Sequence, residues 1–260
     1  MSRKLLKLLR RGGETWISKN ALLYDKFSTP DAAPITSPRT CEPGPGTLTF
    51  VQTDGTQALS NGSYVFTAQA TAVWGDQGFH GTGQTRAAGL TLVCPLTLST
   101  WEECGVGWHT AAAVVDPDSM EHAIQANTTN GQFDTEAPVL AVASGLSAAT
   151  EYKVLQVLRD NGCFYVIDGN LYWASDSGAT ATLYPSFSNL DGAGSMPDID
   201  VLPLATYNSA WGGDWTEVTD TKTNPANETA FNCEADFHLN FTFTQEAGKY
   251  VDISFRFLRP

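Results

Sequence analysis

Residues 151–174 read EYKVLQVLRDNGCFYVIDGNLYWA, and this stretch decides the fold. The pairs Asn161-Gly162 and Asp168-Gly169 each separate two runs that are rich in β-branched and aromatic residues. Such pairs tolerate the positive φ angles that tight hairpin turns require. The stretch therefore predicts a three-stranded antiparallel meander.

Short strand-like segments continue on both sides of this meander. Residues 64–74 alternate with a period of two, with Phe66 and Trp74 on one face and Thr67 and Gln69 on the other. Further strands are predicted, from the same kind of pattern, at 47–52, 87–98, 104–115, 120–127, 138–143, 180–188 and 197–204. No segment after residue 20 has a helical period. The pattern predicts an all-β fold, an antiparallel two-sheet jelly-roll sandwich.

Composition sets the class of the protein and separates its N-terminus from the rest. The chain has 260 residues, 42% of them hydrophobic and only 17% charged, with 28 Asp+Glu against 15 Lys+Arg. Residues 1–20 hold six Lys or Arg and one Glu, a balance of +5, so the net charge of -13 leaves -18 on the remainder. An acidic body argues against a nucleic-acid partner, because binding to phosphates depends on clustered Lys and Arg.

The basic leader predicts a short helix or arm with leucines on one face. The docking residues expected there are Arg3, Lys4, Leu5, Leu6, Leu8, Leu9, Arg10 and Arg11. A docking helix and a frayed terminus are both open readings, because isolated helices this short are marginal in water, and a membrane-surface anchor is less favoured. Lys7 interrupts the leucines, which argues against a signal peptide. No apolar run is long enough to span a bilayer.

Three units are expected along the chain: the arm at 1–20, the jelly roll at 21–205, and a loop with a β-hairpin at 206–260. Within the second unit, the Pro-rich segment 28–47 predicts an extended surface loop. In the third, alternating aromatic residues predict an apolar strand face, which includes Phe237, Phe241, Phe243 and Phe255. A lone ribbon is not stable in water. That face therefore packs on the chain's own sandwich, completes a sheet in a neighbouring copy, or belongs to a longer chain.

The order of these elements resembles the concanavalin A-like, or laminin G-like, jelly roll over residues 21–205. The segments that carry the likeness are LLYDKF at 22–27, YVFTA at 64–68, AGLTLVC at 88–94 and VLRDNGCFYVIDGNLYW at 157–173. Their style is similar to the versions found in tailed-phage virion proteins. The resemblance implies a two-sheet sandwich and a virion setting.

Catalytic and metal signatures are weak in this sequence. Glycanases on this fold use a strand motif Glu-x-Asp-x-x-Glu, and the nearest match, at 234–239, has Leu239 where the second Glu is needed. We therefore expect no enzyme and no catalytic residue. The five cysteines form no CxxC pair, so a zinc site is not expected, and reduced thiols are favoured over a Cys94–Cys104 disulfide. No cofactor is expected; calcium on loop carboxylates such as Asp198 and Asp200 is the one open option.

Binding fits the sequence better than catalysis. Jelly rolls of this type hold glycans on aromatic rings at loop ends, where nearby amides and carboxylates fix the hydroxyls. The ligand-binding residues expected on this ground are Trp74, Asp76, Gln77, Phe79, His80 and Trp101. The alternative for each tryptophan is a place in the core.

Our first functional hypothesis is a structural virion surface protein, a capsid decoration or a tail or head fibre subunit. It would assemble in the host cytoplasm, dock through its arm onto other virion subunits, and present the jelly roll to a host surface glycan. The alternative is a free carbohydrate-binding module or a degenerate glycanase of the same fold. A third hypothesis is an adhesion domain of a long secreted chain.

Overall fold

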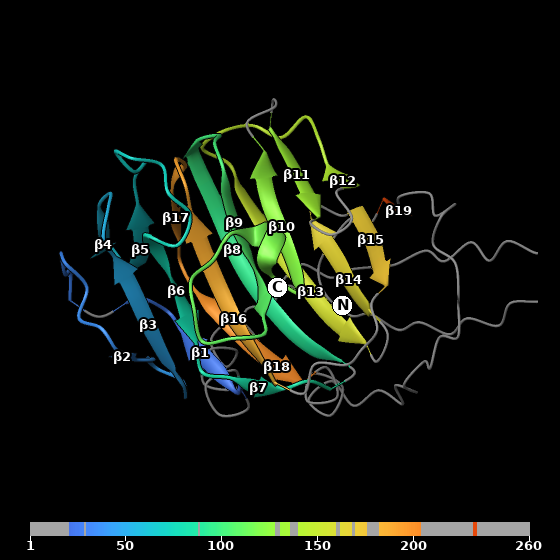
Figure 1. Cartoon of the computed structure of the whole chain (residues 1–260), viewed down its shortest axis with the longest axis horizontal. Helices are drawn as coiled ribbons and strands as arrows, with labels where there is room; N and C mark the ends of the chain where they lie inside the picture. The colour runs from blue at the N-terminus through green and yellow to red at the C-terminus, as the bar shows by residue number, and fades with distance from the viewer. Residues whose placement is uncertain are drawn as a thin grey trace, which may run out of the picture.

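The computed structural model describes residues 21–28, 30–87, 89–127, 131–135, 140–159, 162–167, 170–175, 182–203 and 231–232. These residues form an antiparallel two-sheet jelly-roll sandwich, which confirms the predicted fold class. The two sheets lie over each other in Figure 1. In the described part of the chain the only helical element is a 3-10 turn at Pro117–Ser119, and no helix there is long and apolar enough to cross a membrane.

The first sheet has ten strands and contains the predicted meander. Its order is β19-β15-β14-β13-β8-β17-β5-β4, with β18 paired to β8 and β1 paired to β18. Gln156 lies opposite Tyr165, and Tyr165 lies opposite Tyr172, as three strands joined by hairpins require. The strands are β1 (Leu23–Asp25), β4 (Gln57–Ser60), β5 (Ser63–Phe66), β8 (Leu90–Thr100), β13 (Glu151–Arg159), β14 (Gly162–Ile167), β15 (Asn170–Ser175), β17 (Ala193–Met196), β18 (Ile199–Pro203) and β19 (Phe231–Asn232).

The second sheet has nine strands in the order β12-β11-β10-β9-β16-β6-β3-β2, and β7 pairs with β16. These strands are β2 (Arg39–Thr40), β3 (Thr47–Gln52), β6 (Gln77–Gly81), β7 (Gln84–Thr85), β9 (Cys104–His109), β10 (His122–Asn127), β11 (Gln132–Thr135), β12 (Leu140–Ala143) and β16 (Thr182–Asn189). We call the side of this sheet that faces away from the sandwich interior the outer face.

Aromatic rings from both sheets fill the interior. Tyr64 and Phe66 come from β5, whereas Phe79 and Phe187 come from β6 and β16. The ring centroids of Phe66 and Phe187 are 4.9 Å apart, and those of Tyr64 and Phe79 are 5.4 Å apart. All four side chains are buried, and each buried ring of this size contributes roughly 1.5–3 kcal/mol.

Two predicted strands are shorter in the structure than in the sequence pattern. The strand expected at 64–74 ends at Phe66, because contacts distant in sequence hold the residues that follow. Asp54 accepts hydrogen bonds from the backbone N–H of Thr71 (2.8 Å) and from its hydroxyl (2.6 Å), and Gln69 donates to the carbonyl of Asn189. The strand expected at 104–115 ends at His109, where the chain leaves the sheet.

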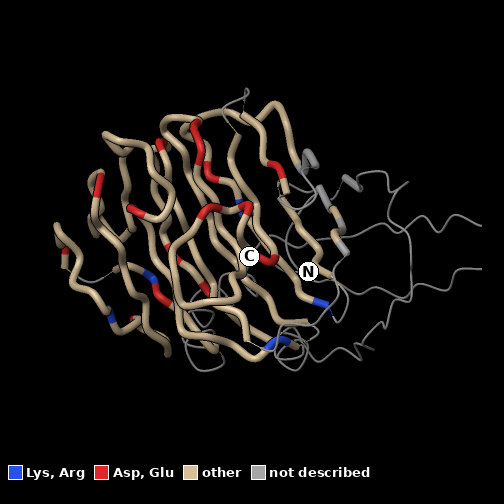
Figure 2. The backbone as a smooth tube through the Cα atoms, in the orientation of Figure 1, with Lys and Arg blue, Asp and Glu red and all other residues tan. Residues whose placement is uncertain are grey.

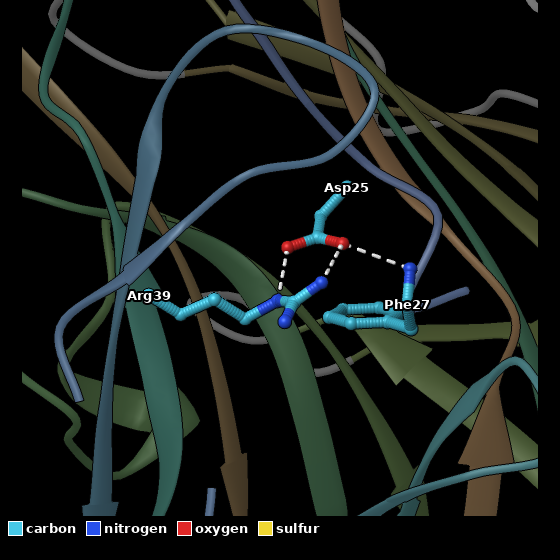
Figure 3. Close-up of polar contacts among 3 residues, drawn as sticks. All are labelled: Asp25, Phe27 and Arg39. Atoms are coloured by element: carbon cyan, nitrogen blue, oxygen red, sulfur yellow. Dashed lines mark hydrogen bonds and ion pairs between the residues drawn. The ribbon is translucent and has the colours of Figure 1, made fainter. Parts of the chain in front are cut away.

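The Pro-rich segment 28–47 is fixed by a buried ion pair (Figure 3). Asp25 is fully buried, and its carboxylate accepts hydrogen bonds from Arg39 Nε at 2.7 Å and Nη2 at 3.1 Å. The same carboxylate accepts the backbone N–H of Phe27 at 2.8 Å, where the chain turns with a φ of 53°. The segment predicted as an extended loop thus includes the short strand β2 and is tied to β1 through Arg39.

The cysteines of the described residues are free thiols. Cys41, Cys94, Cys104 and Cys163 are all buried and unpaired as disulfides, and Cys94 and Cys104 lie in different sheets. Burial, and secondarily the charge of Asp25, raises the pKa of Cys41 to about 12. The predicted arm 1–20 and the aromatic face with Phe237, Phe241, Phe243 and Phe255 lie outside the described residues.

Candidate functional site

The outer face of the nine-stranded sheet carries polar and small side chains. On β16, Leu183 and Phe187 belong to the core, so Tyr184, Ser186 and Ser188 fall on the outer face. The same alternation places Phe79 of β6 inside and His80 outside. Of the predicted site residues, His80 therefore lies on this face.

The alternation of side chains along β6 separates the residues predicted for one ligand site. Gln77 and Phe79 face the interior, whereas His80 faces outward. Phe79 is fully buried among aromatic rings and offers no surface on which a sugar could stack. Gln77 is also fully buried; its amide oxygen accepts from Asn189, and its nitrogen donates to the carbonyl of Thr56 at 3.3 Å. Both side chains lie in the interior and not on the surface where the predicted ligand would bind.

Trp101 lies apart from the other predicted residues, at the loop between β8 and β9. Its ring packs in edge contact against Phe133 and Tyr152, with centroid distances of 5.3 and 6.1 Å. Its indole N–H donates to the carbonyl of Gln132 at 3.3 Å. These contacts support the core alternative for Trp101.

Trp74, Asp76 and His80 remain partly exposed. Trp74 belongs to the loop 67–76, which enters β6 directly after Asp76. That loop is tightly held: the side-chain oxygen of Gln69 accepts the N–H of Val73 at 3.0 Å, and Asp54 binds Thr71. Hydrogen bonds from the Thr71 side chain, and then from its backbone, lower the pKa of Asp54 from 3.8 to about 2.

Tyr184 and His109 complete a cluster that the sequence reasoning missed. The Tyr184 ring is partly exposed and meets the His80 ring edge-on, with centroids 6.4 Å apart. His109 lies directly opposite Tyr184 in the β9–β16 register. Burial lowers the pKa of His109, and a backbone hydrogen bond with Ser119 opposes that shift only in part, so the environment favours the neutral imidazole. The alternation of Leu183 and Phe187 with Tyr184 was the signal available in the sequence.

An amide and carboxylate cluster lies farther along the outer face, on β10 and β11. Asp134 accepts hydrogen bonds from the amides of Asn127 and Gln132, each at 2.6 Å. Among the outer-face positions of the described strands β3, β6, β9, β10, β11 and β16, Asp134 is the only carboxylate. The two-carboxylate mechanism of glycoside hydrolysis needs a second acid nearby.

Metal ligation has little support in the described residues. No group of three or more His, Cys, Asp or Glu side chains there has an arrangement that would hold an ion. Of the pair considered for calcium, Asp198 directly precedes β18 and Asp200 lies within it, buried beside β1 and β8. The motif at 234–239 lies outside the described residues.

Residues 110–121 connect β9 to β10 and cross the middle of the outer face. We call this segment the strap. Ser186 donates its hydroxyl proton to the carbonyl of Ala113 at 3.2 Å, and Pro117 lies over Gly105. The 3-10 turn within the strap is capped by Asp116, whose carboxylate accepts the N–H of Asp118 at 3.1 Å. In Figure 1 the strap is the green loop that runs in front of the sheet.

Charge on the described surface is predominantly negative. Figure 2 shows Asp and Glu distributed over many strands and loops, with few Lys and Arg. Arg86 forms an ion pair with Glu121 at 3.2 Å and also donates to the carbonyl of Arg159. The cation nearest in sequence to the strap is thus already engaged.

Comparisons with known proteins give the fold a context. No family model matches the chain, and no curated protein matches it. Among solved structures, a Trypanosoma rangeli sialidase in complex with sialic acid is 10% identical, with 77% of this chain and 36% of that chain covered and a TM-score of 0.48. A putative beta-glucanase from Mycobacterium abscessus is 12% identical, with 70% and 99% covered and a TM-score of 0.42.

A carbohydrate-binding module, CBM66 from Bacillus subtilis, is 12% identical, with 57% of this chain and 91% of that chain covered and a TM-score of 0.41. None of these three structures is a virion protein by its description. At such identities and TM-scores the likeness carries no inference about ligand or reaction.

Proposed function

We propose that this protein is a non-catalytic carbohydrate-binding jelly roll whose ligand lies on the outer face at Tyr184 and His80. The observation that carries the proposal is the partly exposed Tyr184 ring, held edge-on against His80. A ring in this setting offers an apolar surface for the C–H face of a sugar, while the neighbouring imidazole can exchange hydrogen bonds with its hydroxyls.

The ring is also positioned before a ligand arrives. Tyr184 lies in the middle of the sheet, on the strand between β9 and β6, and its neighbour Leu183 is fully buried. Such a site loses little side-chain entropy on binding, because the strand fixes the backbone and the flanking rings restrict the rotamer. Among the outer-face positions of the described strands β3, β6, β9, β10, β11 and β16, the one carboxylate, Asp134, is already engaged by two amides, which supports binding without hydrolysis.

A glycan array followed by calorimetry tests the proposal. Tyr184→Ala should weaken binding of the array's best ligand by about tenfold or more, the equivalent of ~1.4 kcal/mol, whereas Tyr184→Phe should keep most of the affinity. Phe164→Ala is the matched control, because Phe164 is a partly buried ring on the far side of the ten-stranded sheet. The proposal fails if no glycan binds, or if Tyr184→Ala binds like the unaltered protein.

A virion attachment role is a second proposal, and it is favoured by the charge separation in the sequence. Residues 1–20 carry +5 on a chain whose remainder carries -18, so the arm suits an acidic docking surface. Deletion of residues 1–20 should abolish incorporation into particles and leave glycan binding intact. Normal incorporation of the shortened chain would exclude the arm as the attachment element.

A further inference from the structure

The strap is a built part of the outer face. Gly78, Ser188, Gly105 and Gln125 stand side by side on four adjacent strands, as the pairings of β6, β16, β9 and β10 show. This row spans about 14 Å at the usual strand spacing. Ser188 of this row and Ser186, two residues earlier on β16, face outward but have no exposed surface, so the strap covers this part of the outer face.

The sheet beneath the strap is adapted to carry it. A Cβ on Gly105 would lie 2.3 Å from Pro117 Cγ of the strap, which is the nearest atom to that position. Val114, Pro117 and Met120 of the strap are themselves buried. The capped turn at Asp116 and the Ser186 hydrogen bond fix the strap further. The cover is thus a packed element of the fold.

The strap has a consequence for any ligand held at Tyr184. A long polysaccharide that crosses the strands from Tyr184 would next meet His109, which lies opposite Tyr184 on β9 and is buried, and Pro117 of the strap covers Gly105 farther along β9. On the near side of the strap, Tyr184 and His80 stay partly exposed; on the far side are Asn127 and Gln132. The strap therefore divides the outer face into two short regions.

We infer that the strap restricts this protein to the ends of glycan chains, or to short glycans, and excludes internal segments of long polysaccharides. The inference rests on the proposed function, and it adds the class of ligand. A chain end needs only the near side of the outer face. An internal segment needs a path that continues in both directions, and the strap blocks one of them.

The dependence of affinity on chain length tests the inference. The probes are β-glucans, mannans, galactans and fructans, each offered as a short oligosaccharide of defined length and as the parent polymer, with concentrations expressed per chain. End recognition predicts the same Kd per chain at every length. Internal recognition predicts a Kd per chain that falls in proportion to length, about tenfold for a tenfold longer chain, because each chain then offers more sites.

A strap variant provides the second measurement. Replacing residues 111–119 with a short Gly-Ser loop uncovers Ser186 and Ser188, and this variant should gain the length dependence that the unaltered protein lacks. If it does not fold, the comparison on the unaltered protein still decides. Length-proportional affinity in the unaltered protein overturns the inference but leaves the proposed function standing. Absence of binding to every probe, or unchanged binding by Tyr184→Ala, overturns both.

Discussion

Removing Arg39 should destabilise the whole sandwich through the buried carboxylate it leaves behind. Asp25 has no exposed surface, and Arg39 supplies two of its hydrogen bonds, at 2.7 and 3.1 Å. Loss of one partner of such a pair costs about 3–5 kcal/mol, because the remaining charge is left in a poorly solvated site. For a chain of this size that cost corresponds to a fall in Tm of roughly 6–20 °C.

The assay is urea or thermal unfolding of Arg39→Leu, Asp25→Asn and the double variant. Asp25→Asn removes the charge and keeps an oxygen that can accept the N–H of Phe27. Replacing both members of a buried pair with neutral groups is often close to neutral, so the double variant should be more stable than Arg39→Leu alone. A loss below about 0.5 kcal/mol for Arg39→Leu, or a double variant that shows the full sum of both losses, would refute the reasoning.

Three further outcomes follow from particular contacts. The folded-state pKa of Asp54 is depressed from 3.8 to about 2, so the stability that its ionised form contributes is present above pH 3.8 and is lost as the pH falls towards 2. In urea unfolding at stepped pH, the unaltered protein should therefore be more stable than Asp54→Asn above pH 3.8, and this difference should shrink as the pH falls towards 2. Gly105→Ala should cost about 1–3 kcal/mol by overpacking against the strap, and less in a Pro117→Ala background, because Pro117 Cγ is the nearest atom; equal costs in both backgrounds would contradict the strap contact. In Cys233→Ser, where the other four cysteines are buried, a thiol reagent at pH 8 should react quickly only after denaturant is added, and rapid labelling of the native variant would contradict their burial.

Local patterns were sufficient to predict most of the strands. The Asn-Gly and Asp-Gly pairs near residues 161 and 168 predicted β13, β14 and β15, because turn chemistry and alternation act within a few residues. The predicted strands at 47–52 and 120–127 correspond to β3 and β10. The way the two sheets pack on each other could not be predicted in this way, since it depends on contacts between aromatic rings that are distant in sequence.

Local sequence patterns did not predict how the residues of the candidate site are arranged. Residues 64–74 alternate like one strand, but hydrogen bonds to distant residues hold part of this segment in a loop. Asp54 binds Thr71 across 17 residues of sequence, and Asn189 binds Gln69 across 120. Loop composition suggested Gln77 and Phe79 as ligand contacts, whereas the alternation within β6 turns both inward. The first part of the strap was predicted as the end of a strand. Its actual path over the sheet depends on contacts with other strands, such as that of Pro117 with Gly105.

Charge narrows the class of glycan that the outer face suits. The chain beyond residue 20 carries a net -18, and Asp and Glu predominate over the described surface (Figure 2). Near the strap, Arg86 is already paired with Glu121, and burial lowers the pKa of His109, so neither offers a free positive charge to an anionic sugar. Because like charges repel and buried carboxylates are costly, we expect neutral sugars to bind and uronates or sulfated glycans to be rejected at low ionic strength. The rejection should weaken as added salt screens the surface, and anionic glycans that bind most tightly at low salt would contradict this reading of the surface.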